Sequence, residues 1–188
     1  MSRREFGARV TFVAVAVLTG LLAALISSLG DATRFEPVPR GDQLGQVTGE
    51  SYREYTARAD YSVSAAPAAE PVFALVTFAD VLAPAEASKV LEPFARVNAV
   101  TPAEAAPKPS GEPSQGRDRT ENIQLAAGDQ VVGAIVRDTG DVLRTAAHNP
   151  GIAALEALPP DAVWGAFGVR PVELEAREST YRCTRGSV

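Results

Sequence analysis

The chain has 188 residues, with 23 acidic and 18 basic side chains and a formal net charge of −5. This length allows one ordinary domain with linkers, and the acidic balance argues against nucleic acid as a partner. The single cysteine, Cys183, excludes an intramolecular disulfide. Together with a single histidine, His148, it cannot supply the usual ligand set of a zinc site.

Residues 10–30 form an apolar stretch without charge or proline. A helix over this stretch would rise about 30 Å, the thickness of a bilayer's hydrocarbon core. Arg3, Arg4 and Arg9 precede it, which predicts a cytoplasmic tag at 1–9, a single-pass transmembrane helix at 10–30 and an extracytoplasmic C-terminal domain of the cell envelope. Two alternatives stay open: a cleaved export signal of the twin-arginine type, which would release a secreted domain, and a buried helix of a soluble fold.

Residues 31–70 are rich in proline, glycine and alanine, which is typical of a linker. Within it, Tyr52, Tyr55 and Ala59 recur at spacings of three and four, so we expect a short helix near 48–62. The tyrosine face of this helix either docks on another protein or covers the edge of the domain that follows.

The predicted domain spans 71–176 and begins with a continuous apolar run at 72–78, which indicates a buried strand. Pro84 suits the first position of a helix over 84–92. The alternation over 94–100 then predicts a strand with one wet face.

Residues 101–121 hold four prolines and no aliphatic side chain larger than alanine, so we expect a disordered loop. The pattern then repeats, with a buried strand at 131–136 and a helix that begins near Asp141. A second helical piece is expected at 152–158 and a fourth strand at 162–169, before a flexible tail at 177–188.

This order of elements predicts an α+β domain of the ferredoxin-like type. Two right-handed crossovers would place both helices on one face of a four-stranded antiparallel sheet, behind the N-terminal transmembrane helix. A three-layer α/β sheet is the alternative, although two helices would leave one of its faces bare.

Motifs that carry chemistry are missing from the sequence. We find no G-x-S-x-G, no Walker sequence and no G-x-G-x-x-G, so we predict no catalytic, cofactor-binding or metal-binding residue and no cofactor. His148 precedes Asn-Pro-Gly, where a helix is expected to end, and a surface histidine at a helix C-terminus is the favoured interpretation. The alternative is a ligand-binding domain or enzyme that uses a cleft near His148.

The alanine- and proline-rich composition, the arginine tag, the single span and the one outward domain resemble small single-pass envelope proteins of actinobacteria. The layout is similar to that of accessory subunits of the cytochrome bcc-aa3 respiratory supercomplex. This resemblance implies a membrane protein complex as the partner and transfers no functional residue.

The first strand carries bulky apolar side chains on both faces, which suggests that something covers its second face. We therefore expect a non-catalytic interaction module or accessory subunit, anchored to the membrane. The candidate partner contacts are Tyr52, Tyr55, Phe73 and Leu75.

Overall fold

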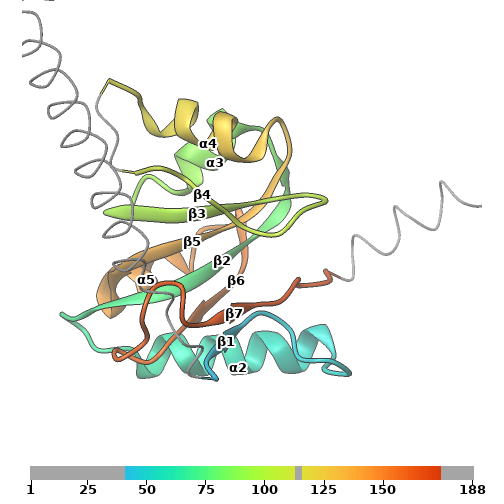
Figure 1. The fold of residues 1–188 in the computed structure, drawn as a ribbon. Coiled ribbons are helices and arrows are strands. Elements are labelled where there is room, and N and C mark those ends of the chain that lie inside the picture. The colour runs from blue at the N-terminus through green and yellow to red at the C-terminus, as the bar shows by residue number, and fades with distance from the viewer. Residues whose placement is uncertain (1–40, 113–115, 175–188) are drawn as a thin grey trace, which may run out of the picture. The chain divides into compact units, whose positions relative to one another are not determined.

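A computed structural model describes residues 41–112 and 116–174. The chain divides into two units, 1–37 and 38–188, and all described residues belong to the second. The fold is α+β, with a five-stranded antiparallel sheet in the order β4-β3-β5-β2-β6 and a separate two-stranded parallel sheet, β1-β7 (Figure 1).

The apolar strand β2, Pro71–Leu82, lies between β5, Val131–Thr139, and β6, Ile152–Ala157. Its run of valine, phenylalanine and leucine suits a strand that is covered on both faces. The fourth long strand, β3, Arg96–Pro102, pairs with β5. The outer strand β4, Lys108–Pro109, has only two residues, and its lysine and proline are typical of a sheet edge that discourages further pairing.

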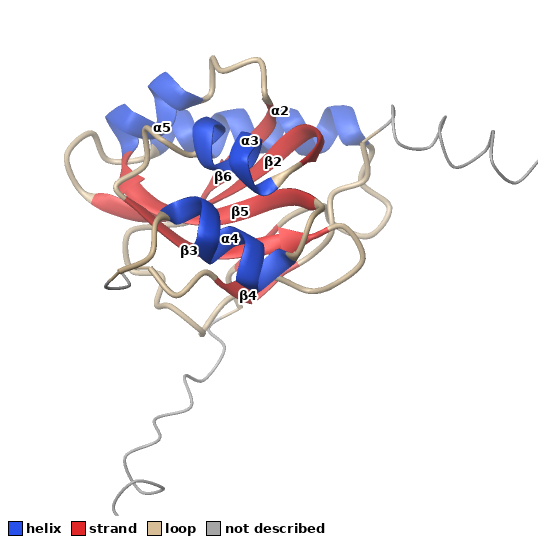
Figure 2. Cartoon of the chain, turned by 90° about the horizontal axis from the view of Figure 1, so that it is seen from above, coloured by secondary structure: helices blue, strands red, loops and turns tan. Residues whose placement is uncertain are grey.

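Three helices cover one face of the sheet, which we call the helix-covered face. They are α3, Pro84–Val90, α4, Arg119–Ala127, and α5, Gly140–Ala146; α3 and α4 are seen lying over the strands in Figure 2. Alternate residues of β2, among them Val76 and Phe78, pack here in the largest apolar core of the described chain.

Helix α2, Tyr52–Ala65, lies along the free edge of β6. It begins with a capping box, in which the Ser51 hydroxyl and the Glu54 carboxylate each accept a backbone N–H of the other's residue. The backbone N–H of Ala157 donates to Oγ of Ser62 at 2.8 Å, and the Tyr52 hydroxyl donates to the carbonyl of Ala153 at 3.1 Å. Side chains of α2 thus take the place of a neighbouring strand at this edge.

The opposite face of the sheet, which we call the second face, carries Phe73 and Leu75 of β2. Residues 158–172 pack over it, together with β1, Gln43–Leu44, which pairs with β7, Gly168–Val169. Phe73, Trp164 and Phe167 form an aromatic cluster with ring centroids 5.4–5.9 Å apart. The chain therefore covers much of its own second face.

The predicted ferredoxin-like arrangement, with four strands, two helices and a preceding transmembrane helix, is wrong. The described residues form five strands in the main sheet, two in the small sheet, and four helices. Residues 152–157, expected to be helical, are strand β6 because they pair with β2. Residues 162–169, expected to be a strand, form turns over the second face and contribute only β7.

The predicted disordered loop at 101–121 also differs from the structure. Its described part contains β4 and the first turn of α4. The backbone N–H of Glu121 donates to Oδ1 of Asp118 at 2.8 Å, which caps that helix. The arginine Arg119 further ties it to the carbonyl of Phe94 at 3.0 Å and to Glu112 at 2.8 Å.

None of the helices within residues 41–112 and 116–174 is long and apolar enough to cross a bilayer. This finding corrects the prediction of a single-pass membrane protein with an extracytoplasmic domain, which the structure does not support. The stretch 10–30 on which that prediction depended lies outside the described residues, as do the tag at 1–9 and the tail at 177–188.

Candidate functional site

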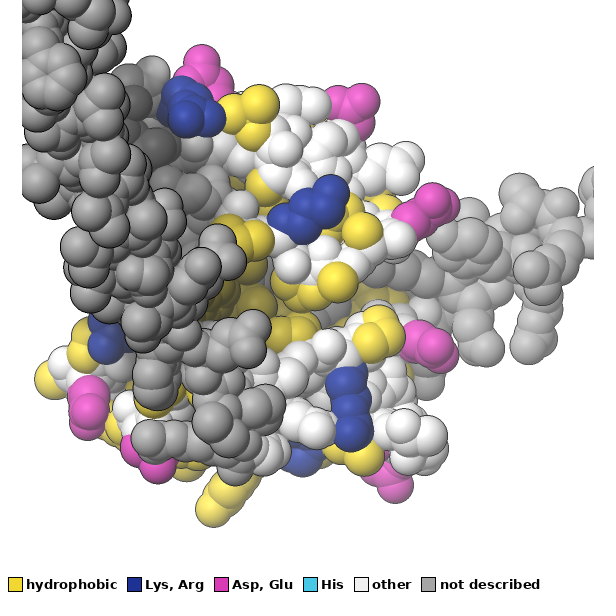
Figure 3. Space-filling model, viewed as in Figure 1, with side chains coloured by type: hydrophobic (Ala, Val, Ile, Leu, Met, Phe, Trp, Pro, Cys, Tyr) yellow, Lys and Arg dark blue, Asp and Glu magenta, His cyan; other side chains and the backbone are white. Residues whose placement is uncertain are grey.

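A cavity of about 490 Å³ lies on the second face of the sheet. Four segments line it: residues 75–77 of β2, 101–107 at the end of β3 and in the loop that follows, 132–133 of β5, and 169–172 near the end of the described chain. Most of the lining side chains are valine, alanine, proline and leucine. Figure 3 shows hydrophobic atoms lining a hollow near the middle of the face that it presents.

Three residues lie side by side across the floor of this cavity. Gly133 of β5 pairs with Thr77 of β2 on one side and with Thr101 of β3 on the other. Neighbouring strands are about 4.8 Å apart, so the two threonines stand about 10 Å from each other with a residue that has no side chain between them. The gap above Gly133 gives the cavity its depth.

Gly133 cannot be replaced without movement of the backbone. A Cβ atom at this position would lie 2.6 Å from the carbonyl oxygen of Val76. The pairing register shifts beyond Thr77 in β2 and beyond Thr101 in β3, on both sides of this glycine. Such irregularities bend strands and re-aim side chains, and here they coincide with the part of the second face that stays uncovered.

The wall formed by residues 169–172 is held in place through β1. The backbone N–H of Arg170 donates to the carbonyl of Leu44 at 2.8 Å. Gly45, which follows Leu44 in the chain, donates its backbone N–H to Oε2 of Glu156 at 2.6 Å. The position of the wall thus depends on a carboxylate of β6 that is only 3 % exposed.

Arg58 of α2 completes this attachment. Its guanidinium pairs with Glu156, contacts Glu50 with Nε 2.9 Å from Oε1, and donates to the carbonyl of Gly45 at 3.0 Å. A buried carboxylate is costly without such a partner. The 41–50 segment, α2 and β6 are therefore joined at one ionic network beside the cavity wall.

The pKa values of the two carboxyl groups in this network are shifted in opposite directions. Burial raises the pKa of Glu156, although hydrogen bonds from Gly45 and Arg58 act against the rise. The hydrogen bond from Arg58 lowers the pKa of Glu50. The guanidinium itself stays charged, because both carboxylates hold the pKa of Arg58 above its ordinary value.

The four predicted partner contacts lie at different depths. Tyr55 is fully buried between α2 and β6, where burial raises the pKa of its hydroxyl. Tyr52 is half-buried beside it. Phe73 belongs to the aromatic cluster under residues 158–172, and Leu75 lines the cavity. The structure thus brings Phe73 and Leu75 to the same face and places the two tyrosines at the sheet edge.

His148 lies away from the cavity, after helix α5. Its ring nitrogen Nδ1 is 2.9 Å from the carbonyl oxygen of Arg144, and its side chain is exposed. The structure does not place it among the cavity-lining residues, and Cys183 lies outside the described residues. Within the described ranges, no three His, Cys, Asp or Glu side chains gather as a metal site requires.

Thr77, Thr101 and Gly133 were not predicted from the sequence as site residues. One signal could have pointed to them: a glycine inside an apolar strand often marks a bulge or a close approach of backbones. Comparisons with known proteins add no further guide, since no family model, no curated protein and no solved structure matches the chain.

Proposed function

We propose that this chain is a non-catalytic binding domain that holds a small, largely apolar ligand in the cavity of the second face. The observation that carries the proposal is the cavity itself. Its volume of about 490 Å³ falls within the range of roughly 300–1,000 Å³ that is usual for small-molecule sites. Like those sites, it combines an apolar lining with a few polar groups.

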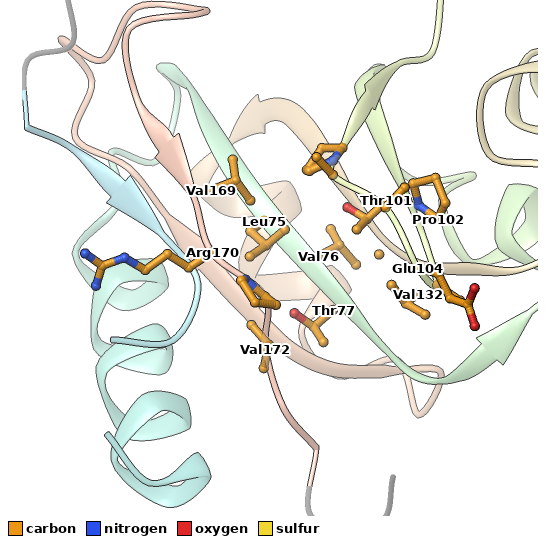
Figure 4. Close-up of a pocket in the computed structure, with 16 residues that line it drawn as sticks. Leu75, Val76, Thr77, Thr101, Pro102, Glu104, Val132, Val169, Arg170 and Val172 are labelled. Atoms are coloured by element: carbon orange, nitrogen blue, oxygen red, sulfur yellow. The ribbon is translucent and has the colours of Figure 1, made fainter. Parts of the chain in front are cut away.

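The lining favours binding over catalysis. Its hydroxyl groups belong to Thr77 and Thr101, and activating a hydroxyl as a nucleophile requires a base within hydrogen-bond reach. Glu104 and Arg170 are the ionisable side chains of the lining. Glu104 is exposed at the margin of the cavity, and Figure 4 shows the Arg170 side chain directed away from the other lining residues.

The second face also bears on the predicted docking role. That hypothesis depended on a second apolar face in need of a cover, and residues 158–172 now account for much of that cover. Docking to a protein partner, including the respiratory complex suggested by resemblance, stays a prediction. The uncovered remainder has the size and concavity of a small-molecule site.

The proposal can be tested with the neutral dye N-phenyl-1-naphthylamine, whose fluorescence rises in apolar surroundings. Titrated into the full chain, the dye should bind and saturate. Val132→Phe places a larger side chain in the lining and should weaken binding at least about tenfold, since a filled cavity excludes the ligand.

Val81→Phe is the matched control, because Val81 is 46 % exposed on the same sheet and does not line the cavity. It should leave dye binding unchanged. Equal binding by the two variants, or no saturable binding by the unaltered chain, would overturn the proposal.

A further inference from the structure

The cavity wall at 169–172 is attached along its length to one short segment, residues 42–46, which we call the latch. Backbone N–H groups in and beside the wall donate to oxygen atoms of the latch at 2.8–2.9 Å: Gly168 to the carbonyl of Asp42, Arg170 to the carbonyl of Leu44, and Glu173 to Oε1 of Gln46. The position of the wall therefore depends on where the latch lies.

The strand pairing of the latch is short. Strands β1 and β7 contribute two residues each, and an isolated two-stranded sheet is only marginally stable in water. The latch has a second attachment at Gly45, whose N–H donates to Glu156 and whose carbonyl accepts from Arg58 at 3.0 Å. The ionic network thus stabilises the attached position of a segment that strand pairing alone holds weakly.

Gly45 is also in tight contact with the wall. A Cβ atom at this position would lie 2.1 Å from the carbonyl oxygen of Arg170, and the backbone of Gly45 has a φ of +92°. The ionic network and the wall therefore meet at one residue without a side chain. A displacement of Gly45 moves Arg170, which lies between the lining residues Val169 and Val172 (Figure 4).

We infer that the latch sets the affinity of the cavity for its ligand. The attached latch holds the wall in contact with the ligand, and a bound ligand in turn stabilises the attached latch, because coupling between two sites is reciprocal. Gly45, Arg58 and Glu156 are then positioning residues, since they act through the wall and do not line the cavity. This inference rests on the proposed function and adds the regulation of the same site.

Arg58→Gln tests the ionic part of the latch, with Arg144→Gln as the matched control. Arg144 is another partly exposed arginine that joins two elements, because it donates to the carbonyls of Val63 and Ala66 and pairs with Asp141, but it does not touch the latch. Both variants should lower stability. Arg58→Gln alone should also weaken binding of N-phenyl-1-naphthylamine, by at least about fivefold, the lower end of usual coupling between sites. Equal dye affinities in the two variants would overturn the inference.

Gly45→Ala tests the contact between latch and wall, with Gly41→Ala as its matched control. Both glycines have a φ of +92°, so alanine is strained equally at each, but a Cβ at Gly41 meets no atom within 4 Å. Gly45→Ala should therefore weaken dye binding by at least about fivefold more than Gly41→Ala does. Dye affinities that fall together would contradict the inference.

Hydrogen exchange of the unaltered chain tests the reciprocal effect without any substitution. Saturating dye should slow exchange of the Gly45 and Arg170 amides, which report detachment of the latch. The control is the amide of Ala147, which donates to the carbonyl of Leu143 at 2.9 Å at the end of α5. Equal slowing at all three amides would show that the ligand stabilises the whole fold without preference for the latch, and the inference would be wrong.

The outcomes distinguish the two proposals. If the unaltered chain does not bind the dye, the proposed function fails and the latch inference fails with it. If Val132→Phe weakens dye binding while Arg58→Gln and Gly45→Ala behave like their controls, the cavity remains a binding site and the role assigned to the latch is wrong.

Discussion

Strand β2 carries Phe78 on the helix-covered face and Phe73 on the second face, and the two rings have different surroundings. Phe78 is completely buried in a core that three helices close. Phe73 lies under an irregular segment, in contact with Trp164, which is itself 39 % exposed. A helix packs against a sheet along its whole length, whereas an irregular segment contacts the sheet only at some of its turns.

This difference between the two faces explains why the cavity lies on the second face of the sheet. The helix-covered face is filled because amphipathic helices supply side chains at regular intervals. On the second face the covering segment consists of turns and a two-residue strand, β7. This segment does not extend over Gly133, where the sheet has no side chain to fill the space. The cavity is thus a consequence of incomplete cover and of a missing side chain at one place.

Replacing each of the two phenylalanines by alanine should give the largest change in stability and tests this comparison directly. Phe78→Ala should lower the free energy of unfolding by about 3–5 kcal/mol, as is usual for a closed core. Phe73→Ala should cost about 2 kcal/mol, because its partly exposed neighbours can move into the space. Urea unfolding of both variants measures the difference, and equal losses would show that the two faces are packed alike.

A second change tests the cavity floor. Gly133→Ala should lower the free energy of unfolding by about 1–3 kcal/mol, because the new Cβ collides with the carbonyl of Val76. Gly168→Ala is the matched control, since a Cβ there would meet only the Gln43 side chain at an ordinary 3.6 Å. Thermal unfolding of the pair measures the effect. A control as unstable as Gly133→Ala would argue against the tight approach at the floor.

The smallest expected change in stability comes from the ionic network that holds the cavity wall, and it depends on pH. Burial raises the pKa of Glu156 in the folded state, so the folded chain holds this proton more tightly than the unfolded chain does. The resulting stabilisation is fully present below the ordinary pKa of glutamic acid and is lost as the pH rises through the raised value. Glu156→Gln removes this loss, and urea midpoints from about pH 4 to about pH 7 should therefore fall less in the variant.

Glu50→Gln should change the pH dependence of stability in the opposite direction. Arg58 lowers the pKa of Glu50, so its contribution is present above the ordinary pKa and disappears as the pH falls through the lowered value. The variant should therefore lose less stability on acidification than the unaltered chain. Changes of the same sign in both variants would contradict the assignment of the two carboxylates.

Sequence patterns predicted the parts of the fold that follow from hydrophobic periodicity. The runs at 72–78 and 131–136 lie within β2 and β5, and Pro84 begins α3. Strand β6 was missed because its sequence, IAALEA, consists of good helix formers, and pairing with β2 overrides that preference. The first turn of α4 carried a readable signal in the Asp118 and Glu121 capping box, which the surrounding prolines obscured.

The cavity could not be predicted in the same way. The neighbours of Gly133 are set by the pairing of three strands, and the register shifts that leave the floor open have no signature in a single sequence. The attachment of the wall joins Glu156 and Gly45 across 111 positions of the chain. Contacts of that range depend on the assembled sheet, so local patterns carry no trace of them.

The aromatic cluster gives the molecule a built-in optical reporter. Trp164 is the sole tryptophan of the chain, and its ring lies 5.7 Å from Phe73 and 5.9 Å from Phe167. Its emission therefore follows the cover of the second face, whereas far-ultraviolet circular dichroism follows mainly the helices. A fluorescence transition that precedes the loss of helix marks the cover as a separate cooperative unit, able to detach while the sheet persists; coincident transitions make cover and sheet one unit.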